Sequence, residues 1–138
     1  MNPSIFKAYD IRGIYPKDIN EEVVEKIAKV CVMMFNPGIV IVAHDIRHGS
    51  ISLAQKAKDG LERKAKEIGK NIKVEFVGQS STPMFYFLVN HLEASGGIMI
   101  TASHNPKNYN GMKISKEKAV LISGIEIKEF MGKNHINI

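Results

Sequence analysis

Apolar runs of strand length alternate with amphipathic helical segments along most of this chain, and that alternation restricts its fold more than any other feature. "GIVIVAHD", residues 38–45, is a continuous β-branched run, which is typical of a strand covered on both faces. Before it, residues 20–35 repeat apolar side chains at helical spacing after the capping residue Asn20. Strands that alternate with helices predict an α/β domain with a mainly parallel sheet. At 138 residues the chain is expected to form a single domain, residues 1–138.

The remaining segments continue the alternation. A second helix is expected to begin near Ser52, whose spacing to Gln55 fits a capping box, and to end at Gly69. Thr82 followed by Pro83 predicts the start of a third helix. The tail from residue 121 carries a helix-like pattern without a clear closing residue. Further strands are expected over residues 5–14, 71–79 and 96–103, with a short extended return at 111–115.

The charge of the chain is spread along its length. The formal net charge is +5, but no segment forms a dense basic run, and aromatic residues are not interleaved with basic ones as a base-stacking surface requires. This distribution disfavours a nucleic-acid partner and suits a mildly positive cleft for a small phosphorylated metabolite.

Membrane and secretory classes are also disfavoured. No apolar stretch has the length of a membrane span, and the N-terminus lacks the basic and apolar halves of a secretory signal. The single cysteine, Cys31, lies on the apolar face of the first helical pattern. We therefore expect Cys31 to pack in the core of a cytoplasmic protein.

Polar side chains gather where three of the expected strands end. Ligands of open α/β sheets bind at the carboxyl ends of parallel strands, so these clusters mark the expected site. Arginine, histidine and lysine around a hydroxyl suit a phosphate dianion, and a serine among them could carry a phosphoryl group as a covalent catalyst. The clusters are Tyr9, Asp10 and Arg12; His44, Asp45, Arg47 and His48; and Ser103, His104 and Asn105 with Lys113 following.

The serine cluster also has a simpler interpretation as a solvated turn. Residues 105–106, Asn-Pro, and 110–111, Asn-Gly, are common turn dipeptides. Ser103 and His104 cannot form a hydrolase triad by themselves, because the base of such a triad comes from elsewhere in the fold. From the residues alone, both the turn and the reaction centre remain open.

The second cluster allows several interpretations. His44 and His48 have the spacing of a helical metal site, but they lie at a strand end before a glycine, which disfavours a metal. Arg47 suits either an anion contact or a structural ion pair.

Two strings, "FKAYDIRG" at residues 6–13 and "GIMITASHNPKNYNGMKI" at residues 97–114, carry a resemblance to a known family. They are similar, in order and in approximate spacing, to the N-terminal domain of the α-D-phosphohexomutases, the phosphomannomutase and phosphoglucomutase group. The second string is very specific, and the resemblance covers essentially the whole chain. It implies a three-layer α/β/α domain around a mixed four-stranded sheet.

The resemblance implies a role for each matching residue. Ser103 matches the serine that is phosphorylated in the active enzyme and whose phosphate also binds Mg²⁺. Lys113 and Arg12 match a lysine and an arginine proposed to contact the transferring phosphate. His104, the neighbour of the serine, completes the expected catalytic set. The expected substrate or phosphate contacts are Tyr9, Asn105 and Arg47.

One segment departs from the family pattern. Where the family usually reads Gly-Arg-Asp-x-Arg-x-Ser, residues 43–49 read Ala-His-Asp-Ile-Arg-His-Gly, and Ser50 comes one place later. Asp45 and Arg47 are retained.

The resemblance also implies what activity would require. Members of the family have four domains, and the metal, sugar-recognition and phosphate-binding loops of domains II–IV are absent from this sequence. We therefore expect the phosphoserine domain of a phosphomannomutase/phosphoglucomutase, inactive alone, whose reaction moves a phosphoryl group between C1 and C6 of a hexose phosphate. The expected cofactors are Mg²⁺, held with domain II carboxylates, and hexose 1,6-bisphosphate as activator.

Three kinds of partner follow from these expectations. The partners of a mutase domain would be hexose phosphates and the missing domains II–IV. A non-catalytic module for assembly or phospho-ligand binding is the alternative, and it would self-associate through the exposed domain interface. A basic nucleic-acid binder is the third interpretation.

Overall fold

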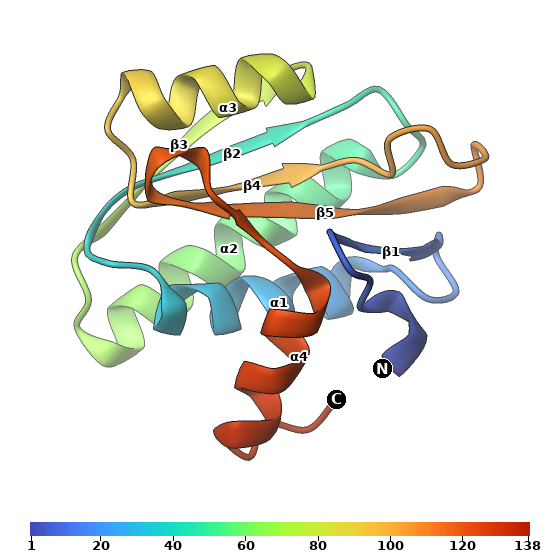
Figure 1. Ribbon diagram of the computed structural model, residues 1–138, viewed down its shortest axis with the longest axis horizontal. Coiled ribbons are helices and arrows are strands. Elements are labelled where there is room, and N and C mark those ends of the chain that lie inside the picture. Colours follow the sequence, from blue (N-terminus) through green and yellow to red (C-terminus); the bar gives the residue numbers. More distant parts are fainter.

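The computed structural model describes residues 1–138 as one sheet with helices packed against it (Figure 1). The strands are β1 (Ile11–Ile14), β2 (Gly38–His44), β3 (Ile72–Gln79), β4 (Gly96–Ile100), β5 (Tyr109–Lys116) and β6 (Leu121–Ile122). The α-helices are α1 (Glu21–Met34), α2 (Ser50–Ile68), α3 (Thr82–His91) and α4 (Gly124–Lys133). Two short 3₁₀ helices, η1 (Pro3–Ile5) and η2 (Glu117–Ala119), complete the chain.

The sheet is mixed. Its main path runs in the order β1-β5-β4-β2-β3, and β6 pairs with β5 beside β1. β2 is parallel to β3 and β4, whereas β5 is antiparallel to β1, β4 and β6. The α/β class and the mixed sheet are therefore confirmed, but the expected four strands are wrong, because the sheet has six. The strand expected over residues 5–14 contains β1, whereas β6 has only two residues and is too short for a periodic pattern to reveal it.

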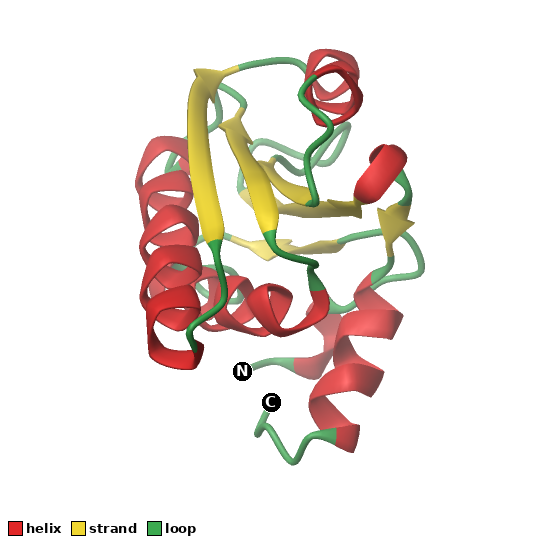
Figure 2. Cartoon of the chain, turned by 90° about the vertical axis from the view of Figure 1, so that its left-hand side faces the viewer, coloured by secondary structure: helices red, strands yellow, loops and turns green.

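Two layers of helices cover the two faces of the sheet, as the turned view of Figure 2 shows. Alternate residues of the central strands serve opposite faces. Val40, Val42 and Ile98 belong to the larger core with α1 and α2. The intervening Ile41 and Met99 pack with α3 in the smaller core. The expected three-layer arrangement is therefore confirmed.

The opening strand is shorter than the sequence pattern predicts. Phe6 forms an isolated bridge with Ile11, and the backbone N–H of Lys7 donates to the carbonyl of Asp10 over 2.8 Å. Residues 7–10 therefore make a turn, and β1 begins only at Ile11. As a result, Tyr9 and Asp10 precede the strand instead of following it.

The start of α2 also differs from the prediction. The helix begins at Ser50, after Gly49 at a φ of 84°, and Ser52 lies inside its first turn. The hydroxyl of Ser52 donates to the carboxylate of Glu21 over 2.7 Å, so it does not cap its own helix. Ser50 is drawn into the polar network described below, and this explains why the helix starts two residues early.

The other helix ends follow familiar capping rules. The hydroxyl of Ser81 caps α3, one residue before the predicted Thr82, and Pro83 lies in the first turn. The tail pattern is the helix α4, which begins with a capping box from Ser123 to Glu126 and has its closing residue at Asn134. No helix combines the length and the apolar character that crossing a bilayer requires.

Cys31 provides a test of the core. The side chain is fully buried on α1, as expected, and burial raises the pKa of its thiol well above the ordinary value. We expect a disulfide reagent that reports thiols by absorbance to leave the folded chain unlabelled at neutral pH, because the reactive thiolate is both inaccessible and scarce. The chain unfolded in guanidinium chloride is the control and should react with one equivalent. Full labelling of the folded chain would contradict this packing of α1.

Candidate functional site

An open depression of about 810 Å³ lies where β2 and β4 end and α3 begins. Five of the seven predicted site residues line it together, and only Asn105 and Arg47 do not. Carboxyl ends of parallel strands are the usual position of ligand sites in such sheets. The lining residues are Tyr9, Asp10, Arg12, Asp45, Thr82, Pro83, Thr101, Ser103, His104 and Lys113.

The register of the sheet explains why residues distant in sequence share this depression. Lys113 pairs with Met99, which belongs to the core on the α3 side. Arg12 pairs with Gly111, two positions from Lys113 on the same strand. Paired residues and residues two apart share a face of a sheet. The guanidinium and the ammonium group are therefore presented on the α3 face, next to the end of β4.

A buried carboxylate holds the two cations. Asp10 is 2% exposed, and its Oδ2 accepts a hydrogen bond from Nζ of Lys113 over 3.4 Å. Its Oδ1 lies 3.0 Å from Nε of Arg12, an ion pair in which no N–H points at the oxygen well enough for a hydrogen bond. The pKa of Tyr86, on α3, is raised mainly by burial of its side chain and secondly by the negative charge of Asp10. The cations are thus fixed in place before any anion binds.

No sequence pattern indicates a separate role for Asp10. Its only signal was its position between Tyr9 and Arg12 in the opening string. The pairing with Lys113 depends on the contact between β1 and β5, which no local pattern shows.

Ser103 lies in a strained backbone conformation. The segment of residues 101–108, the serine loop, connects β4 to β5, and Ser103 has a φ of 54° within it. A left-handed conformation costs a residue other than glycine about 1–2 kcal/mol, so other contacts must hold it. The backbone N–H of Ser103 donates to Oγ1 of Thr101 over 3.0 Å, whereas its own hydroxyl has no hydrogen-bond partner. No other protein group therefore holds the hydroxyl.

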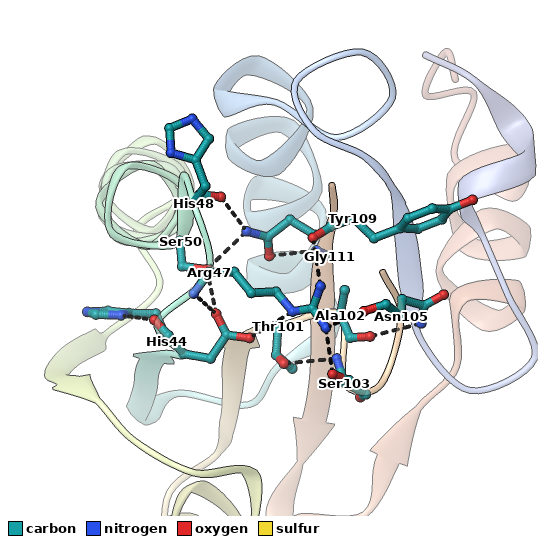
Figure 3. A network of polar contacts seen from close by, with 12 residues as sticks. His44, Arg47, His48, Ser50, Thr101, Ala102, Ser103, Asn105, Tyr109 and Gly111 are labelled. Atoms are coloured by element: carbon teal, nitrogen blue, oxygen red, sulfur yellow. Dashed lines mark hydrogen bonds and ion pairs between the residues drawn. The ribbon is translucent and has the colours of Figure 1, made fainter. Parts of the chain in front are cut away.

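Arg47 does not line the depression, and Figure 3 shows its side chain extending toward Ser103, Asn105 and Tyr109. Its guanidinium donates to backbone carbonyls of the loop and pairs with the carboxylate of Asp45. Ser50 donates to Oδ1 of Asp45 over 2.6 Å and accepts from the amide of Asn110 over 2.9 Å. This network joins the loop after β2 to the serine loop. The ion-pair interpretation of Arg47 agrees with these contacts, and a direct phosphate contact would require breaking one of them.

The other predicted residues are placed as follows. His104 and Tyr9 line the depression, and Tyr9 is 68% exposed. Asn105 turns inward, and its amide donates to the carbonyl of Ala102 over 2.8 Å. Their functional roles stay predictions.

Neither the paired histidines nor the depression forms a metal centre. Nδ1 of His44 lies 2.8 Å from the carbonyl oxygen of Asp45, and the ring of His48 packs edge-on against Tyr15. No group of three histidine, cysteine or carboxylate side chains could hold a metal ion anywhere in the chain. The carboxylates of the depression, those of Asp10 and Asp45, are occupied by cationic side chains. These residues do not fit Mg²⁺ by themselves.

Comparison with known proteins agrees with this architecture. The model of the family described as phosphoglucomutase/phosphomannomutase, alpha/beta/alpha domain I, matches residues 3–133. The chain is 40% identical over 118 residues to phosphohexose mutases of Xanthomonas campestris pv. campestris and 43% identical over 119 residues to a phosphomannomutase of Escherichia coli. Each match covers 86% of this chain and 25% of the relative, so the chain matches about a quarter of the length of these proteins.

A solved structure is similar over nearly the whole chain. The crystal structure of a phosphoglucomutase/phosphomannomutase family protein from Burkholderia thailandensis superposes with a TM-score of 0.79 at 32% sequence identity. The match covers 96% of this chain and 30% of that protein.

Gly111 tests the contact that brings the two cations together. A Cβ at this position would meet the carbonyl oxygen of Ile11 and lie 2.9 Å from Cα of Arg12, so β1 can approach β5 only because residue 111 has no side chain. We expect Gly111→Ala to lower the free energy of unfolding by about 1–3 kcal/mol through overpacking, measured by urea denaturation. Gly132→Ala is the control, because a Cβ there meets nothing within 4 Å. Equal stability of the two variants would contradict the described pairing of β1 and β5.

Proposed function

The chain belongs to the phosphoglucomutase/phosphomannomutase family as its α/β/α domain I, and we propose that Ser103 is the residue that carries the phosphoryl group in a hexose phosphate mutase. The whole reaction would be an intramolecular transfer between C1 and C6 of a hexose phosphate. The names of the relatives support a phosphomannose or phosphohexose substrate.

One observation carries this proposal. The hydroxyl of Ser103 has no hydrogen-bond partner and shares a depression with Arg12 and Lys113, whose positions are fixed by a buried carboxylate. A free hydroxyl beside two preorganised cations suits the attack of oxygen on a phosphorus that carries negative charge. The start of α3 at Thr82 adds the positive end of a helix dipole to the same depression.

The proposed step needs only these groups and one phosphoryl donor, hexose 1,6-bisphosphate. Oγ of Ser103 forms a bond to a phosphorus of hexose 1,6-bisphosphate while the bond from that phosphorus to the sugar oxygen breaks. The proton of the hydroxyl ends on the sugar oxygen, and the products are phosphoserine and a hexose monophosphate. Lys113 and Arg12 would stabilise the charge on the phosphoryl oxygens during the transfer. To complete the mutase reaction, the phosphoserine would give its phosphoryl group to the free hydroxyl of a hexose monophosphate, and Ser103 would then take the other phosphate of the bisphosphate so formed.

Mg²⁺ would have a supporting role in this proposal, because this chain alone cannot complete its coordination. It would neutralise charge on the phosphate of Ser103, but the chain offers no set of three metal-ligating side chains. The ligands that complete its coordination would have to come from outside these residues. The cytoplasmic location expected from the single cysteine stays a prediction.

One surface favours the assembly module as a second candidate. Met84 and Phe87 on α3 are 50% and 55% exposed, next to the residues of that helix that line the depression. Apolar side chains gathered on one helix are typical of a surface that another protein or domain covers. Sedimentation equilibrium tests self-association there: a strictly monomeric chain at high concentration would remove self-association as a function of this surface.

Phosphoryl uptake tests the role of Ser103. We expect the chain, incubated with a hexose 1,6-bisphosphate and Mg²⁺, to gain one phosphoryl group on Ser103, detected by peptide mass spectrometry. Ser103→Ala should abolish the uptake, and Arg12→Met or Lys113→Met should slow it by about a hundredfold, the usual effect of removing a group that stabilises transition-state charge. Ser4→Ala, at an exposed serine of η1, is the matched control. Uptake that survives in Ser103→Ala would remove this serine from the mechanism.

Turnover of the isolated chain gives a second test. We expect no appreciable interconversion of mannose 1-phosphate and mannose 6-phosphate by residues 1–138, because the depression is open and holds the groups for only one end of the sugar. A coupled assay for mannose 6-phosphate measures this directly. Sustained turnover would show that the chain binds both ends of the sugar.

A further inference from the structure

We infer that Arg47 is the positioning residue of the proposed site, because its guanidinium gathers the backbone carbonyls of the serine loop and thereby fixes where the Ser103 hydroxyl lies. The inference rests on the proposed function for the meaning of that hydroxyl. The contacts that carry it are independent of the reaction.

The first observation is a convergence of carbonyl groups. Nη2 of Arg47 donates to the carbonyl of Ser103 over 2.6 Å and to that of Asn105 over 2.7 Å. Nη1 donates to the carbonyl of Pro106 over 2.7 Å and to that of Tyr109 over 3.2 Å. Four carbonyl oxygens therefore point their negative ends at one centre, where they would repel one another without a cation. The planar guanidinium satisfies them in two pairs.

The second observation concerns how Arg47 itself is held. Its Nε lies 3.5 Å from Oδ2 of Asp45, and its backbone N–H donates to Oδ1 of the same carboxylate over 2.9 Å. Ser50 adds a third contact to that carboxylate. Nη1 and Nη2 of the guanidinium therefore each donate to two protein carbonyls, Nε is paired with Asp45, and the side chain is only 15% exposed. Arg47 acts on the site through the loop, since its terminal N–H groups are all taken by the protein.

The third observation is that residues 103–106 have no other hydrogen bond to a segment distant in the sequence. Their remaining hydrogen bonds are local: the N–H of Ser103 donates to Oγ1 of Thr101, the N–H and the side-chain amide of Asn105 donate to the carbonyl of Ala102, and the N–H of Tyr109 donates to the carbonyl of Pro106. The backbone N–H of Tyr15 holds the far side of the loop through the carbonyl of Asn108. Arg47 therefore makes all the hydrogen bonds that join residues 103–106 to a segment distant in the sequence. Together with the contact to Thr101, this side chain holds Ser103 in its left-handed conformation.

The chemistry of arginine is specific for this task. A lysine at position 47 would carry the same charge, but its ammonium group is a point with three donors and cannot serve two pairs of carbonyls in one plane. The serine loop should therefore keep part of its wild-type order in Arg47→Lys. In Arg47→Met, which keeps only the aliphatic stem, it should lose the order that the guanidinium provides.

Nuclear magnetic resonance of the ¹⁵N-labelled chain tests the position of the loop. We expect the amide order parameters of Ser103, His104 and Asn105 to fall from about 0.85 to below about 0.6 in Arg47→Met, with intermediate values in Arg47→Lys. Amides of β2 and β4 should keep their values. Arg63→Met is the matched control, because Arg63 is an exposed arginine of α2 that pairs with Glu25. Unchanged order in Arg47→Met would overturn the inference.

The rate of phosphoryl uptake by Ser103 separates positioning from ligand binding. As donor concentration varies, the limiting rate should fall by about tenfold to a hundredfold in Arg47→Met, the usual effect of a misplaced reacting group. The half-saturating donor concentration should stay within about twofold, because Arg47 gives the donor no hydrogen bond. The opposite pattern, a raised half-saturating concentration at an unchanged limiting rate, would make Arg47 a ligand and overturn the inference.

The two measurements also separate this inference from the proposed function. If the unaltered chain takes up no phosphate, the proposed function fails its own test, and the order parameters still decide the role of Arg47. If Arg47→Met does not fold, Arg47→Lys decides by the same two readouts, and wild-type values in both would overturn the inference.

Discussion

The antiparallel pairing of β1 with β5 is the constraint on which the site depends. It sets Arg12 opposite Gly111 and brings the carboxylate of Asp10 within 3.4 Å of Lys113, although these residues are 103 positions apart in the chain. Because β5 also pairs with β4, the same strand fixes the opening string relative to the serine loop. The close approach requires a residue without a side chain at position 111, so the geometry of the cations begins with one glycine.

The charges of the depression follow from that geometry. Asp10 is buried between two cations, which compensates the desolvation of its carboxylate and holds both cations at the wall of the depression. Neither cation has to reorganise far when a phosphate arrives, and preorganised charge of this kind is the most effective form of electrostatic stabilisation. The exposed Tyr9 and His104 stand at the open side, whereas the charged groups lie deeper.

A second set of contacts joins the loop after β2 to the serine loop. The carboxylate of Asp45 accepts hydrogen bonds from the hydroxyl of Ser50 and the backbone N–H of Arg47, and it pairs with the guanidinium of Arg47. The side-chain amide of Asn110 donates to the hydroxyl of Ser50 and to the carbonyl of His48. Ser50 comes one place later than in the usual family pattern, yet it begins α2 and still reaches Asp45. The segment that departs most from the pattern therefore supports the loop that carries the serine.

The sequence by itself determined the class of the fold and five of the residues that line the depression. Periodicity and capping residues located α1, α2, α3 and the central strands within a few residues, and the string around Ser103 pointed to a phosphoryl-carrying serine, because these signals are local. The tertiary structure alone decided the number of strands, the buried pairing of Asp10 with Lys113, and the contacts of Arg47 with the serine loop. A strand of two residues, such as β6, has no readable period, and contacts between segments far apart in the chain exist only after the sheet has set their register.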